Sequence, residues 1–170
     1  EQLEALRGGG LLHKRAMILQ PAHLLSSLLQ DIEVSWGAPA DLDLAAKSVG
    51  GESFDAIVLA NGWQMGAALP ELALKGRLGQ IETYESDIAA PPSALAAGPY
   101  ALALAERRLW GATFADQVGD VPQVSDQARA ENQSALEQLN PYWRGEAIKA
   151  ERQSRAGVRA TTADRLPLIG

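Results

Sequence analysis

The sequence predicts a mixed α/β (α+β) fold in which most strands pair antiparallel, together with helices and one strand of parallel type. Three observations support this prediction. Several segments alternate apolar and polar residues with the period of a half-buried strand. One stretch that follows a serine has the period of an amphipathic helix. One nearly unbroken apolar run, at 54–60, has the composition of a strand covered on both faces.

The first part of the chain is expected to hold a strand, a helix and a second strand. The apolar run 16–19 is closed by Gln20 and Pro21, and Pro21 suits the first helical turn because its missing N–H has no partner there. The spacing of the leucines that follow predicts one buried helical face: Leu24, Leu25, Leu28 and Leu29. Residues 32–36 alternate as a strand does, and residues 37–51 are expected to form a connector.

The apolar run 54–60 ends in Asn61 and Gly62. Ligands of open α/β sheets bind beyond the carboxyl ends of such strands. Because glycine has no Cβ, Gly62 allows close approach of a backbone to a ligand. The alternative is that Gly62 only makes the turn that ends the strand.

Residues 74–114 are predicted to form three strands. Residues 74–83 hold two glycines within a strand-like pattern, which indicates a bulged or kinked strand. The segment 89–99 is rich in proline and alanine and is expected to be a loop. Residues 100–105 and 109–114 are predicted to pair as an antiparallel hairpin around a charged turn at 106–108.

The last elements are a helix and further strands. Ser125 is a favourable N-cap for a helix that ends near Leu139, before Asn140 and Pro141. Residues 147–161 are expected to form one or two strands. No internal repeat or low-complexity segment is evident.

The composition is that of an ordinary globular domain, with 46% hydrophobic and 21% charged residues in 170. No apolar stretch has the length of a membrane span. From Pro141 onward, six basic and three acidic residues give a net charge of +3, so the first 140 residues carry −9 of the total of −6. This basic end either meets a phosphate backbone or forms a solvated face.

Several chemistries are excluded or disfavoured. The chain has no cysteine, which excludes disulfides, thiolate catalysis and cysteine-ligated zinc. His13 and His23 lack acidic partners at ligand spacing, so we expect no metal site. The sequence holds neither a G-x-G-x-x-G nor a Walker A motif, and thus no standard dinucleotide site of its own.

Four segments in order carry a family resemblance: 59–64 (Leu-Ala-Asn-Gly-Trp-Gln), 78–81 (Leu-Gly-Gln-Ile), 111–114 (Gly-Ala-Thr-Phe), and 157–170, which runs Gly-Val-Arg through Asp164 to Leu-Pro-Leu-Ile-Gly. Together they resemble the FAD-dependent D-amino-acid oxidase-like superfamily. The Leu-Ala-Asn-Gly-x-Gln form, followed by Gly-Gln, is similar to the branch that acts on a tRNA wobble uridine.

The resemblance implies that residues 1–170 belong to a two-domain flavoprotein that uses FAD. They would supply a substrate domain with a largely antiparallel sheet, plus one strand, near 54–62, of a Rossmann-like FAD domain. Because the chain opens on Glu1 and closes on an apolar run ending in glycine, we expect it to be a piece of a larger enzyme, which also carries the dinucleotide loop and a C-terminal helix. The implied reaction is oxidation of a secondary amine.

The resemblance also implies a set of site residues. Arg159 would grip a substrate carboxylate and is the residue expected to be catalytic, whereas the alternative is an ion pair with Asp164. Trp63 and Trp110 would flank a planar base, the alternative being that they are core residues. The residues expected to line the flavin are Asn61, Gly62, Gly79, Gln80 and Gly170.

The substrate is left open between tRNA, whose wobble carboxymethylaminomethyl group would become aminomethyl, and a small amino acid such as glycine, sarcosine or a D-amino acid. A different class, a non-catalytic ligand-binding module, is also left open by the missing dinucleotide loop. We expect no membrane partner and no metal, and a cytoplasmic location.

Overall fold

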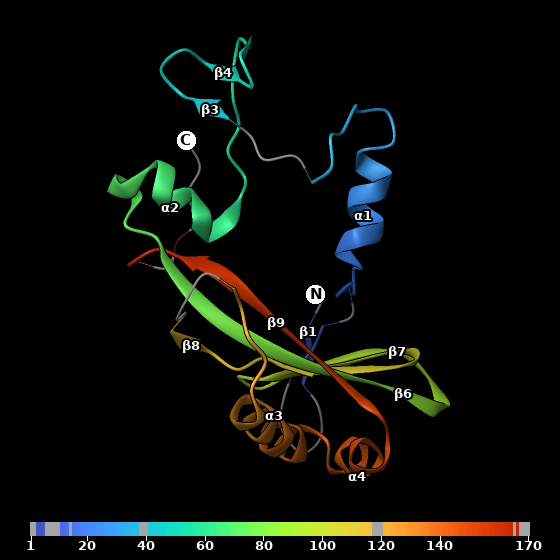
Figure 1. Ribbon diagram of the computed structural model, residues 1–170. Coiled ribbons are helices and arrows are strands. Elements are labelled where there is room, and N and C mark those ends of the chain that lie inside the picture. The colour runs from blue at the N-terminus through green and yellow to red at the C-terminus, as the bar shows by residue number, and fades with distance from the viewer. Residues whose placement is uncertain are drawn as a thin grey trace. The chain divides into compact units, whose positions relative to one another are not determined.

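The computed structural model describes residues 3–5, 11–13, 15–37, 41–116, 121–164 and 166, and Figure 1 shows their elements. The chain divides into two units, residues 1–55 and 56–170. The described elements combine helices with antiparallel sheets, which confirms the predicted α+β class.

The described residues of the first unit form two small antiparallel sheets and one helix. The elements are β1 (Leu3–Ala5) paired with β2 (Leu11–His13), helix α1 (Pro21–Leu28), and a three-stranded meander of β3 (Leu42–Asp43), β4 (Ser48–Val49) and β5 (Glu52–Ser53). The meander lies in the segment that the sequence predicts as a connector.

The prediction for this unit is partly wrong. Helix α1 begins at Pro21 as predicted, but residues 16–19 and 32–36 form no strand. The leucines of α1 are exposed, with 63% of Leu28 open to solvent. Apolar periodicity indicates which face a helix can bury, and no described element of this unit covers that face.

Residues 54–60 also form no strand, contrary to the sequence prediction. Val58, in the middle of the run, is 88% exposed. A strand exists only where a neighbouring strand accepts its ladder of hydrogen bonds, and no described strand pairs with this segment. Its assignment to a cofactor domain stays a prediction.

The second unit is built on one long central strand, β6 (Lys75–Ala96). On one edge it pairs with β7 (Tyr100–Gly111) and β8 (Ala115–Asp116), and on the other with β9 (Arg152–Thr161). All of these pairs are antiparallel. The register places Arg77 opposite Arg159.

Two predictions for this sheet are wrong. The expected loop at 89–99 continues β6 as far as Ala96, with two register shifts that accommodate the proline-containing stretch. The expected hairpin at 100–114 is instead the single strand β7. The charged residues at 106–108 fit within it because Arg107 pairs across the ladder with Glu85 at 2.8 Å.

Arg108, the next residue of β7, is only 2% exposed. Its guanidinium donates to the carbonyl oxygens of Ala105 and Ile88 and lies 5.6 Å from the ring of Trp143. The backbone carbonyls thus solvate this buried charge, and charge alone does not mark a turn.

The helices of this unit follow the predicted capping signals. Helix α3 (Asp126–Leu139) begins after Ser125, whose Oγ accepts the N–H of Ala128 at 3.1 Å. Asn140 then caps α4 (Pro141–Lys149), which the sequence analysis missed, so the expected strand starts at Arg152 instead of 147. Three short helices precede β6: η1 (Gly62–Gln64), α2 (Met65–Ala68) and η2 (Pro70–Leu72).

Helices α3 and α4 lie against one face of the sheet (Figure 1). This covered face is formed by the even-numbered residues Gln80, Glu82 and Tyr84 of β6 with Ser154 of β9. The core lies here: the rings of Tyr84 and Trp110 meet edge to face at 5.7 Å beside the buried Leu136. The odd-numbered residues, including Arg77, Gly79 and Arg159, form the opposite, open face.

Candidate active site

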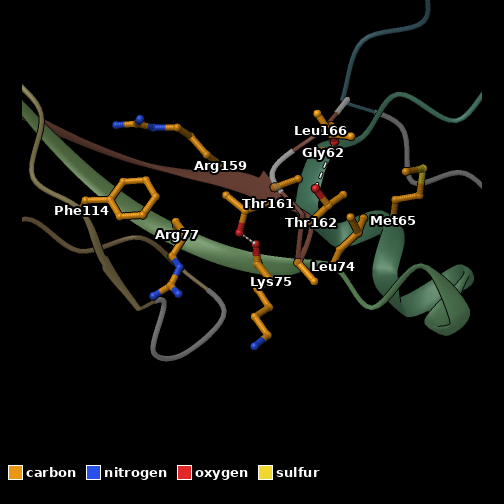
Figure 2. Close-up of a pocket in the computed structure, with 12 residues that line it drawn as sticks. Gly62, Met65, Leu74, Lys75, Arg77, Phe114, Arg159, Thr161, Thr162 and Leu166 are labelled. Carbon is orange, nitrogen blue, oxygen red and sulfur yellow. Dashed lines mark hydrogen bonds between the residues drawn. The ribbon is translucent and has the colours of Figure 1, made fainter. Parts of the chain in front are cut away.

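A cavity of about 670 Å³ lies on the open face, where β6 begins and β9 ends. It is closed by η1 and α2 and by the segment that follows β7 (Figure 2). The lining residues are Gly62, Met65, Leu74, Lys75, Arg77, Phe114, Arg159, Ala160, Thr161, Thr162, Ala163 and Leu166. The volume is within the range of small-molecule sites.

Arg159 has no acidic partner among the described residues. Its guanidinium carbon lies 5.5 Å from the centre of the Phe114 ring. The guanidinium carbon of Arg77 lies 5.7 Å from the same ring, but Arg77 also pairs with Asp116. Among the described residues, therefore, no acid compensates the positive charge that Arg159 presents to the cavity.

Asp164 is not the partner of Arg159. Its Oδ1 accepts the backbone N–H of Leu166 at 3.0 Å, and the hydroxyl of Thr162 donates to the carbonyl of Leu166. The N–H of Leu166 first, and then the Thr162 hydroxyl, hold the pKa of the exposed Asp164 below its usual value. These contacts order the segment that forms one wall of the cavity.

Gly79 supports Arg159. A Cβ at Gly79 would lie 2.8 Å from Nη2 of Arg159 and 3.2 Å from the carbonyl oxygen of Thr113. The missing side chain thus lets the guanidinium rest against β6. Gly79 is buried beneath Arg159 and is not among the residues that line the cavity.

Gly62 lines the same cavity as Arg159, from η1. Its φ of +67° lies in the left-handed region, and a Cβ there would meet no atom within 4 Å. The position therefore favours glycine for its backbone and leaves open space toward the cavity. Asn61, which precedes it, is exposed and makes no side-chain cap.

Gln80 does not face the cavity. It is 1% exposed on the covered face, and its amide donates to Glu82 at 2.7 Å and accepts the N–H of Ser125 at 2.8 Å. Asn132 donates to its carbonyl at 2.8 Å. The side chain thus fixes the start of α3, and the expected flavin contact is corrected to a structural role.

The two tryptophans are not at the cavity either. Trp110 is 1% exposed within the core, so the expectation that it flanks a substrate base is wrong. Trp63 is half-buried and lines a separate hollow formed with Gln64 and Pro70. Gly170 lies outside the described residues.

Sequence reasoning missed Phe114 and Arg77 as cavity residues. Phe114 stands in the Gly-Ala-Thr-Phe segment, but its position after β7 carries no period that distinguishes a core residue from an exposed one. Arg77 shares a face with Gly79 because strand residues two apart point the same way. Once Gly79 is known to lie on the open face, this rule puts Arg77 on that face as well.

Two further kinds of site were sought in the part of the chain that the structure describes. There, no three His, Asp or Glu side chains gather as a metal site, and no helix has the length and apolar character needed to cross a membrane.

The chain matches the model of the FAD dependent oxidoreductase family (DAO) over residues 1–170. The protein therefore belongs to this family, as the four sequence motifs predict.

The chain is also similar to individual known proteins. It is 31% identical, over 96% of its length, to the tRNA 5-methylaminomethyl-2-thiouridine biosynthesis bifunctional protein MnmC of Caulobacter sp. (strain K31), of which it covers 28%. It resembles the crystal structure of glycine oxidase from Geobacillus kaustophilus with a TM-score of 0.58 and 25% identity, over 69% of this chain and 33% of that one.

Iminodiacetate oxidase from Chelativorans sp. BNC1 shares the fold, with a TM-score of 0.54 and 22% identity over 66% of this chain and 32% of the oxidase. The chain thus spans between a quarter and a third of the length of these relatives.

The residues at the cavity fit the approach of a flavin. Gly62 has a left-handed backbone, and a Cβ there would meet no described atom within 4 Å. Gly62 would lie against the cofactor, and Arg159 would face the substrate. The described residues hold no dinucleotide turn, so they would contribute only to this end of the cofactor site.

Proposed function

We propose that the protein is an FAD-dependent oxidoreductase that oxidises secondary amines carrying a carboxylate. Its proposed substrate is the carboxymethylaminomethyl group of a tRNA wobble uridine, which it converts to aminomethyl. The family match and the 31% identity to MnmC support this proposal, as does Arg159, which has no acidic partner among the described residues. The observation that carries it is the shared cavity of Arg159 and Gly62.

Arg159 would bind the carboxylate of the substrate. A bidentate contact between a guanidinium and a carboxylate is worth about 1.5–3 kcal/mol in a site from which water is excluded. Gly79 would keep the guanidinium in place against β6, and the Thr162–Leu166 contacts would hold the adjacent wall. The carbon between nitrogen and carboxylate would then face the side on which Gly62 lies.

FAD, when bound, supplies the acceptor for the two electrons and the hydrogen that leave this carbon. The resulting substrate imine is hydrolysed by water, which releases glyoxylate and leaves the primary amine on the uridine. Arg159 keeps its charge throughout because the guanidinium does not deprotonate in proteins. Its role is thus orientation and charge complementarity.

The second candidate substrate is a free amino acid such as glycine or sarcosine. The likeness to glycine oxidase at 25% identity favours it, and an Arg159 carboxylate site would serve either substrate. Action on tRNA would agree with the expected cytoplasmic location.

The test uses the full-length protein. We expect it to show flavin absorbance, and to release glyoxylate and hydrogen peroxide from tRNA that carries carboxymethylaminomethyluridine, at a higher kcat/KM than from glycine or sarcosine. A colourless protein that stays colourless after FAD is added would support a non-catalytic module instead. Turnover of amino acids without turnover of tRNA would select the second substrate.

A further inference from the structure

Phe114 is the aromatic residue that lines the cavity, and 60% of it is exposed. It stands on an anchored segment: the N–H of Thr113 donates to the carbonyl of Gln80 at 3.2 Å, and the hydroxyl of Thr113 accepts the N–H of Gln80 at 3.0 Å. The ring is therefore presented at a fixed place although it is open to solvent.

Two guanidiniums flank this ring. In Figure 2, Phe114 lies between Arg159 and Arg77, whose guanidinium carbons are 5.5 and 5.7 Å from its centre. The contact with Asp116 compensates the charge of Arg77 and restrains it, whereas Arg159 stays free for an anion. An exposed aromatic ring beside guanidiniums is the type of surface on which unstacked nucleobases stack.

We propose that Phe114 is the stacking surface for the planar ring of a substrate whose carboxylate is held by Arg159. This inference rests on the proposed function and narrows its substrate class to molecules that join a planar base to a carboxylate through a short amine linker. It also replaces Trp110 and Trp63 in the role that the sequence suggests for them.

The dimensions of such a substrate fit the site. Four single bonds of about 1.5 Å separate the uracil ring from the carboxylate carbon in a carboxymethylaminomethyl group, which gives an extended reach of about 5 Å. The separation between the Phe114 ring centre and the Arg159 guanidinium carbon is 5.5 Å. A base on Phe114 therefore leaves the carboxylate within reach of Arg159, with the amine between them.

A free amino acid would use only half of this surface. Sarcosine offers a carboxylate to Arg159 but has no ring for Phe114. Phe114 is thus a specificity-determining residue that separates ring-bearing from ring-free amines, and its loss should affect only the first class.

The test compares full-length Phe114→Leu, which keeps an apolar side chain but lacks the ring, with Phe114→Tyr, which keeps the ring. We expect Phe114→Leu to lower kcat/KM for carboxymethylaminomethyluridine in tRNA by about 5-fold to 150-fold, chiefly through KM. Phe114→Tyr should restore it. The inhibition constant of sarcosine, which reports on Arg159, should stay unchanged in both variants.

Ile148→Ala removes an exposed apolar side chain from α4, which does not line the cavity, and serves as the matched control. If Phe114→Leu weakened tRNA turnover and sarcosine binding by the same factor, or left kcat/KM for tRNA unchanged, the stacking role would be overturned. The proposed oxidase activity would still stand. If the wild-type protein oxidises no amine at all, the proposed function itself fails, and this inference with it.

Discussion

The two faces of the sheet in the second unit are made from the same four strands but differ in how their polar groups are paired. The covered face buries Gln80, Glu82 and Tyr84 beneath α3 and α4, and the side chains of all three hydrogen-bond within the protein, whereas the buried Nε1 of Trp110 has no hydrogen-bond partner among the described residues. On the open face, Arg159 has no acidic partner in the part of the chain that the structure describes, and Phe114 is exposed. The buried polar side chains of the covered face bond mainly to one another, whereas Arg159 on the open face is available to bind a ligand.

Glu82 illustrates how a buried polar side chain of the covered face is hydrogen-bonded within the protein. The carboxylate is fully buried, yet it accepts hydrogen bonds from Gln80 at 2.7 Å and from Ser154 at 2.6 Å, and Arg129 lies 3.8 Å away. A buried charge is tolerable when it is paired and hydrogen-bonded in this way. The network joins β6, β9 and α3, so it positions the strands that carry Arg77 and Arg159 on the reverse side.

The largest expected effect is on the covered face. Trp110→Ala should lower the free energy of unfolding of the full-length protein by about 3–5 kcal/mol, because it leaves a cavity between Tyr84 and Leu136. The measurement is urea unfolding followed by circular dichroism. Trp63→Ala is the matched control: since Trp63 is only half-buried, its loss should be smaller. Equal losses of unfolding free energy in the two variants would show that Trp110 does not lie in the core.

The covered face was also the more predictable one. The Ser125 cap and the Asn140–Pro141 end of α3 follow from capping preferences and helical period, and both are found as expected. These signals are local, so a single sequence carries them. The strand β9 is likewise confirmed, apart from the three residues that α4 takes from its expected start.

A smaller effect is expected at the helix cap. Ser125→Ala should cost about 1 kcal/mol of stability because the N–H of Ala128 loses its acceptor. Ser134→Ala, an exposed position within α3, should leave stability unchanged or raise it slightly, since alanine favours a helix more than serine. If Ser125→Ala and Ser134→Ala lowered the free energy of unfolding equally, the hydrogen bond from Ala128 to Ser125 would contribute nothing to stability. Neither should alter the preference between amine substrates.

The open face was predicted only in part, because its features depend on contacts between distant segments. Sequence motifs identified Arg159 and Gly62, which do line one cavity. The interior positions of Trp110 and Gln80, and the exposure of Phe114, depend on which face each strand residue occupies. The sequence shows which residues of a strand share a face, but which of the two faces α3 covers depends on packing between distant segments.

The apolar runs that were predicted as strands but form none show the same dependence. Residues 54–60 have the composition of a buried strand, but strand formation requires a neighbour in space as well as an apolar sequence. The helix α1 needs no such partner for its backbone hydrogen bonds and forms as predicted. Local elements were therefore predicted better than those that need distant pairing.

The most direct test of the carboxylate site compares two arginines of one strand. Arg159 and Arg155 both lie exposed on β9 and share the open face, but only Arg159 lines the cavity. The substrates are tRNAs whose wobble uridine carries either carboxymethylaminomethyl or methylaminomethyl, which differ only in the carboxylate.

Arg159→Met in the full-length protein should lower kcat/KM for the carboxymethylaminomethyl substrate by about 10-fold to 150-fold and leave the methylaminomethyl substrate unaffected. Arg155→Met should change neither. Equal losses on the two substrates, or equal effects of the two substitutions, would show that Arg159 does not bind the carboxylate.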